Sequence, residues 1–144
     1  MVHEQNRQDR DDHIEFRCSM IKGFFGALMK AMADGMSKEE AVKKLCEDGQ
    51  TMEKYDFAAK QYVKGAGVPN YKIDGPEFDF ESIMLYSSTA YAANGMCHSD
   101  LKWCPIVKIK KENGVQVGVE RIEPNLKPSK GDTEFVRKWY PWGG

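Results

Sequence analysis

The chain has 144 residues, of which 41% are hydrophobic and 30% charged, a balance typical of a single soluble domain. Its 21 Lys and Arg residues against 22 Asp and Glu residues leave a formal net charge of −1, which removes the main support for binding nucleic acid through its phosphates. The mean hydropathy is −0.61, and the most apolar window, residues 20–36, is interrupted by Lys22, Lys30 and Asp34. A membrane span needs about 20 consecutive apolar residues, so we expect neither a nucleic-acid partner nor a membrane.

Four cysteines favour an oxidising compartment, because an even set is typical of the disulfide frameworks of exported proteins. Cys97 and Cys104 are close enough in sequence to form a local disulfide, and Cys18 with Cys46 is the candidate for a second one. A zinc site built from cysteines is the weaker alternative, since neither pair has the C-x₂₋₄-C spacing of such sites.

The first 64 residues predict a short strand followed by helices. Ile14 and Phe16, two apart, suit a strand with one buried face. Apolar residues then recur at intervals of three and four, which predicts a helix with a buried stripe. The stripe consists of Met20, Ile21, Phe24, Phe25, Leu28, Met29 and Met32.

Two more helices are expected before the middle of the chain. Ser37 and Glu40 have the spacing of a capping box, with Ser37 at the N-cap and Glu40 reaching back to it. Gly49 should end this second helix, and a third should cover residues 51–63.

The second half reads as loops, a hairpin and a closing helix. Glycine and proline leave little room for regular structure over residues 65–105. Residues 106–122 alternate on both sides of an Asn-Gly pair, which predicts a β-hairpin with a type I′ turn. A short amphipathic helix should cover residues 130–140, with Asp132 as its N-cap.

The first chemical signal is His3 followed by Glu4. In the zinc motif H-E-x-x-H, two histidines one helical turn apart bind the metal and the glutamate is the general base. Here the fifth position is Arg7, whose guanidinium has no lone pair to give a metal. His13 and His98 are the other two histidines, and neither has the spacing to replace the missing metal-binding histidine. The H-E-x-x-H interpretation therefore fails.

A longer pattern accounts for the same residues. Metzincin peptidases carry H-E-x-x-H-x-x-G-x-x-H, followed far downstream by a methionine-containing turn, the Met-turn. Residues 3–14 read HEQNRQDRDDHI, which closely resembles the segment of astacin-like peptidases that begins at their third zinc histidine. Those peptidases usually have an aromatic residue where His13 stands.

Two further segments extend the resemblance to about the whole chain. Residues 78–86, FDFESIMLY, look like the Met-turn of the family, although most members have His at the position of Leu85. The tail at 128–141 is similar to the closing helix of these domains, whereas the helical insert at 19–64 matches no motif of the family. The implied fold is α+β: the C-terminal half of a zincin-like metalloprotease domain spanning 1–144.

The resemblance implies a zinc-dependent metalloendopeptidase acting on a protein or peptide substrate. His3 would be the third zinc ligand, and Tyr86 would approach the metal as a switch ligand and stabilise the oxyanion. Met84 would form an apolar floor beneath the Zn²⁺ ion. Glu4 would meet the buried amino terminus of the processed enzyme.

The other two zinc histidines and the catalytic glutamate of the family are not in this sequence. Zinc catalysis needs three protein ligands and a water, so we expect an incomplete domain that is inactive alone. The chain as written has no signal peptide, and we expect it to be part of a longer secreted protein. The alternative is a non-catalytic peptide-binding remnant. A half-domain should expose apolar surface at Ile14, at Phe16 and around Met84.

Plainer interpretations stand beside these. Met84 and Tyr86 alone would be an ordinary core methionine and a half-buried tyrosine. The Asp and Arg run at 7–12 suits a salt-bridged surface, whose members can also orient the His3 segment. The aromatic residues at 139–142 suit packing.

Overall fold

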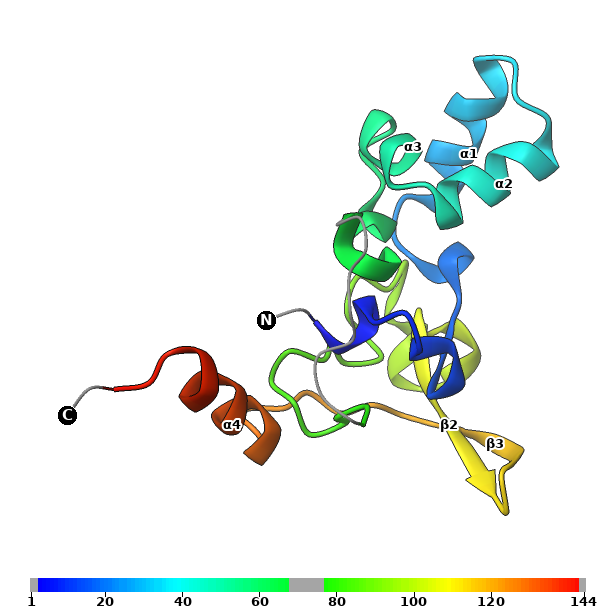
Figure 1. Cartoon of the computed structure of the whole chain (residues 1–144). Coiled ribbons are helices and arrows are strands. Elements are labelled where there is room, and N and C mark those ends of the chain that lie inside the picture. Colours follow the sequence, from blue (N-terminus) through cyan, green and yellow to red (C-terminus); the bar gives the residue numbers. More distant parts are fainter. Residues whose placement is uncertain (1–2, 68–76, 143–144) are drawn as a thin grey trace.

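The computed structural model describes residues 3–67 and 77–142 (Figure 1). The described part is α+β, as expected, with a three-stranded antiparallel sheet in the order β1-β2-β3. The α-helices are α1 (Phe24–Ala33), α2 (Lys38–Glu47), α3 (Gly49–Lys54) and α4 (Lys130–Trp139), and the strands are β1 (Ile14–Phe16), β2 (Ile106–Glu112) and β3 (Val115–Glu120). Short 3-10 helices are η1 (Glu4–Asn6), η2 (Arg10–Asp12), η3 (Cys18–Met20), η4 (Ala58–Tyr62), η5 (Lys64–Gly67), η6 (Gly95–His98) and η7 (Leu101–Trp103). No helix in these ranges is long and apolar enough to cross a membrane.

The sheet confirms the predicted strand and hairpin. Strand β1 pairs with β2 so that Phe16 lies opposite Ile106, and β2 pairs with β3 through the hairpin. Asn113 and Gly114 both have positive φ, 51° and 78°, which is the backbone that a type I′ turn requires.

The helical insert forms as expected, but its boundaries differ. Ser37 caps α2 by accepting a hydrogen bond from the Glu40 backbone, whereas the Glu40 side chain pairs with Lys44 at 3.1 Å. Gly49 begins α3 instead of ending α2. The single helix expected over 51–63 is broken at Asp56, whose φ is +47°, and continues as the 3-10 helix η4.

The predicted apolar stripe is only partly the buried face of α1. Leu28 is buried together with Ala27 and Ala31, while Phe25 is 72% exposed and Met29 is also exposed. The small alanines face the core and large residues beside them do not, so spacing alone overestimated the width of the buried face. Met20 and Ile21, also assigned to the stripe, precede the helix.

The main core lies between the insert and the sheet. Ile14 is only 1% exposed and Phe16 is half-buried, with its ring stacked 5.1 Å from that of Tyr62. The expectation that Ile14 would be exposed is therefore wrong, because aromatic and aliphatic side chains of the insert cover β1. Beside Met84, Ile83 is exposed, as expected. Other fully buried members of this core are Ile21, Leu45, Met52, Phe57 and Ile106.

Both expected disulfides are present. The Cys18–Cys46 bond ties the segment after β1 to the end of α2, and the Cys97–Cys104 bond closes the loop before β2. The second bond forms a small separate core with Val107.

Helix α4 lies at the far end of the molecule from α1, α2 and α3 (Figure 1). Its N-cap is Ser129, not Asp132, because Asp132 occupies the third helical position and completes a capping box with Ser129. The packing role expected for the aromatic residues at its end is met only by Trp139, whose ring lies 6.2 Å from that of Phe135. All three are exposed, and Trp142 is 94% exposed.

Candidate functional site

His3 lies against the turn that contains Met84, although 81 positions separate the two residues in sequence. The His3 Nδ1 atom is 2.8 Å from the Met84 carbonyl oxygen, and the ring centroids of His3 and Tyr86 are 5.2 Å apart. Because a carbonyl oxygen only accepts, the neutral imidazole must carry its proton on Nδ1, which leaves the lone pair on Nε2. The structure thus brings His3, Met84 and Tyr86 together.

Tyr86 is half-buried among other aromatic rings. Its hydroxyl donates to the side-chain oxygen of Gln61 at 3.3 Å, and its ring centroid is 5.8 Å from that of Tyr91. Burial, reinforced by Tyr91, raises the pKa of Tyr86 above its usual value. The phenol therefore keeps its proton at neutral pH and is a hydrogen-bond donor.

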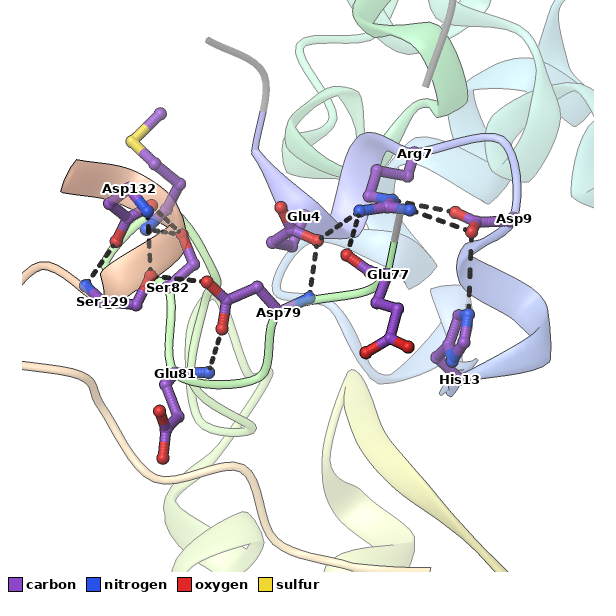
Figure 2. Close-up of polar contacts among 11 residues, drawn as sticks. Glu4, Arg7, Asp9, His13, Glu77, Asp79, Glu81, Ser82, Ser129 and Asp132 are labelled. Atoms are coloured by element: carbon purple, nitrogen blue, oxygen red, sulfur yellow. Dashed lines mark hydrogen bonds and ion pairs between the residues drawn. The ribbon is translucent and has the colours of Figure 1, made fainter. Parts of the chain in front are cut away.

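Glu4 holds the loop that precedes the Met84 turn. Its Oε2 atom accepts from the backbone N–H of Asp79 at 3.1 Å and from the Arg7 guanidinium at 3.2 Å (Figure 2). Burial raises the pKa of Glu4, against the opposing effects of these two donors. The contact expected between Glu4 and an amino terminus stays a prediction.

Arg7 forms ion pairs with Glu4 and Asp9, as expected of the run at 7–12, but it is buried, so the expected surface location is wrong at this position. It is 2% exposed and donates to both oxygens of the Asp9 carboxylate, through Nε at 2.9 Å and through Nη2 at 3.0 Å. A third contact, to the Glu77 carbonyl at 2.8 Å, joins the N-terminal segment to the Met84 loop. Arg10 is also buried and donates to the carbonyls of Gln5 and Tyr62. Backbone carbonyls thus satisfy donors that a sequence pattern assigns to solvent.

His13 stacks on an aromatic ring. Its ring lies 4.9 Å from that of Phe78, with an interplanar angle of 24°. Its Nε2 is 3.6 Å from the Asp9 carboxylate, at one end of a line of polar contacts through Arg7 and Glu4 (Figure 2).

Sequence reasoning missed the side chains that fix the Met84 turn. The Asp132 carboxylate accepts from the Ser82 hydroxyl at 2.6 Å and from the Ile83 N–H at 2.9 Å. Burial alone would raise the pKa of Asp132, but hydrogen bonds from Ser82, Ser129 and Ile83 outweigh it and lower the pKa below its usual value. The only sequence signal was the capping spacing at Asp132, which says nothing of Ser82.

Residues 3–67 and 77–142 bring few metal-binding side chains together. They contain no group of three or more His, Cys, Asp or Glu side chains that could hold a metal ion. His3 Nε2 and the Tyr86 hydroxyl are candidate donors where His3 lies against the Met84 turn, whereas His13 contacts Asp9 and Phe78. A scan against known protein families and a search of curated proteins both return no match for this chain.

Proposed function

We propose that this chain supplies part of the active site of an astacin-like zinc metalloendopeptidase. The observation that carries the proposal is the His3 imidazole, held through Nδ1 by the Met84 carbonyl and beside the Tyr86 ring. Metal-binding histidines characteristically donate their second ring N–H to a carbonyl or carboxylate, which fixes the tautomer and orients the other nitrogen. The sequence likeness of residues 3–14 and 78–86 to the family points to the same chemistry.

The residues present fit part of a zinc site. His3 would bind Zn²⁺ through Nε2, and Tyr86 is a second, weaker donor nearby. When bound, zinc lowers the pKa of a coordinated water to about 7 and so provides a nucleophile for peptide hydrolysis. The remaining ligands and the general base would come from residues outside this chain, and residues 1–144 would be the C-terminal part of the domain.

The side chains of this chain would have distinct tasks in that reaction. His3 would bind Zn²⁺, and the Met84 carbonyl holds the imidazole ring in place. The protonated Tyr86 hydroxyl can donate to an oxygen that gains negative charge, once it leaves Gln61. The two disulfides suit a secreted protein, and we place the parent protein outside the cell.

A second candidate is a peptide-binding protein without catalysis. The shortage of a third donor among the described residues favours it, because two donors hold zinc weakly. Both candidates share the same fold and differ in metal content.

Metal content and proteolysis, measured on this chain and on any longer product of its gene, test the proposal. In the longer product we expect one zinc per molecule and chelator-sensitive cleavage of a denatured protein. His3→Ala should remove the zinc, while Tyr86→Phe should keep it and lower kcat by about 10²–10³-fold. His98→Ala changes an exposed histidine and serves as the matched control.

Zinc binding and cleavage that survive His3→Ala would overturn the assignment. Peptide binding by a protein that holds no zinc and cleaves nothing would establish the second candidate instead.

A further inference from the structure

The turn that holds His3 is itself fixed by a residue from the other end of the chain. Asp132, in the first turn of α4, is buried and lies 50 positions after Ser82. One carboxylate oxygen accepts from the Ser82 hydroxyl at 2.6 Å, and the other accepts from the backbone N–H of Ile83 at 2.9 Å. Figure 2 shows this carboxylate beside the loop that carries Ser82.

The Ser82 hydroxyl passes this constraint to Met84. A hydroxyl has one hydrogen, and here Asp132 takes it. The Ser82 oxygen can then only accept from the Met84 N–H, which lies 3.0 Å away. The Ser82 oxygen therefore holds the peptide group between Ile83 and Met84 by its N–H. The next peptide group, between Met84 and Leu85, is held by the Leu85 N–H, which donates to the Ser82 carbonyl at 3.1 Å, and its Met84 carbonyl accepts from His3 Nδ1 at 2.8 Å.

We propose that Asp132 is a positioning residue that sets the orientation and tautomer of His3 through Ser82 and Met84. Its use in zinc binding rests on the proposed function, whereas the relay of hydrogen bonds does not. Asp132 touches neither His3 nor a reacting atom, so its effect is transmitted by the turn.

The chemistry of the contacts requires a carboxylate. Three donors face the two oxygens of Asp132: the Ser82 hydroxyl, the Ile83 N–H and the Ser129 N–H at 2.9 Å. An asparagine offers one oxygen, and its amide N–H groups would face either the Ile83 and Ser129 N–H donors or the Ser82 hydroxyl, whose hydrogen would then lose its acceptor. Asp132→Asn keeps the shape and breaks at least one branch of the relay.

A merely structural role is the competing explanation, since Asp132 also completes the capping box of α4. Ser129→Ala separates the two. It removes the hydroxyl that caps the Asp132 N–H at 3.0 Å and that also donates to the Asp79 carboxylate, and it leaves the contacts of Asp132 with Ser82 and Ile83 intact. Ser82→Ala breaks the relay by removing the hydroxyl that donates to Asp132, and it leaves the capping box between Ser129 and Asp132 in place.

The test is the ring ¹⁵N spectrum of His3 in the metal-free labelled chain. It is recorded above about pH 8, where imidazoles are neutral and the two tautomers differ in nitrogen shift. The wild type should show the Nδ1–H tautomer. Asp132→Asn and Ser82→Ala should each shift the tautomer ratio about fivefold toward Nε2–H, the factor expected for one net hydrogen bond. Ser129→Ala and Glu134→Gln should leave it unchanged.

Circular dichroism checks folding, and Ser82→Ala carries the test if Asp132→Asn does not fold. An unchanged ratio in the folded relay variants overturns the proposal, and so does an equal shift in Ser129→Ala. This test uses no metal, so its outcome is independent of zinc binding. If the tautomer ratio shifts as expected but the longer product binds no zinc, the proposed function is refuted and the role of Asp132 stands.

Discussion

Replacing Arg7 should cost more stability than any other single charged side chain near the site. The guanidinium is bound by Glu4, by both oxygens of Asp9 and by the Glu77 carbonyl, and its side chain is 3% exposed against 14% for Glu4 and 26% for Asp9. Hydrogen bonds to charged groups contribute about 1.5–3 kcal/mol each when buried, and the more exposed Asp9 pair less. Removing one partner of such a set typically costs about 3–5 kcal/mol, because the other charge stays buried.

We therefore expect Arg7→Ala to lower the free energy of unfolding in urea by about 3–5 kcal/mol. Arg7→Lys keeps the charge but loses the planar fork, so it should recover about half of this loss at most. Arg137→Ala, on the exposed face of α4, is the control and should change stability by less than about 0.5 kcal/mol. A loss below about 1 kcal/mol for Arg7→Ala would refute the view that Arg7 joins the N-terminal segment to the Met84 loop.

Three further outcomes are expected. The lowered pKa of Asp132 means that its contribution is present above the unfolded pKa of about 3.9 and is lost as pH falls through the lower folded value. The stability difference between wild type and Asp132→Asn should therefore shrink below about pH 4, while Glu134→Gln shows no such trend; urea unfolding across pH measures it. Removing the Cys18–Cys46 disulfide, with a sequence separation of 28, should lower the free energy of unfolding by about 3.5 kcal/mol. Removing the Cys97–Cys104 disulfide, with a separation of 7, should lower it by about 2.5 kcal/mol, and calorimetry of the two double alanine variants compares these losses. Gly114→Ala, at a φ of +78°, should cost about 1–2 kcal/mol in thermal unfolding because an L side chain is strained there.

The features that sequence predicted correctly are local or covalent. The Asn-Gly turn of the hairpin and the cap at Ser37 depend on residues within a few positions of each other. The Cys97–Cys104 disulfide closes a loop between cysteines seven positions apart. The chain has only four cysteines, so this bond leaves Cys46 as the one partner for Cys18. In these cases the residue type and its spacing nearly determine the geometry.

The features that sequence missed depend on what covers a residue. Arg7 looks the same in sequence whether it faces water or the Glu77 carbonyl, and only the fold supplies that carbonyl. The stripe of α1 shows the opposite error, since Phe25 has the spacing of a core residue but no part of the described chain covers it enough to bury it. The spacing of apolar residues predicts which face of a helix is apolar, but it does not show which residues pack against that face.

The candidate site combines both kinds of information. Residue types around His3 and Met84 suggested a metal ligand and its floor, but only the structure supplies the hydrogen bond that assigns the proton to Nδ1. Asp132 has the spacing of a helix cap, and half of its hydrogen bonds do close the cap of α4. The other half reach back to Ser82 and Ile83, 50 and 49 positions away, where no local pattern records them. The Asp132 carboxylate thus joins helix α4 to the turn that contacts His3. Loosening this contact should therefore change the orientation and the tautomer of the His3 imidazole.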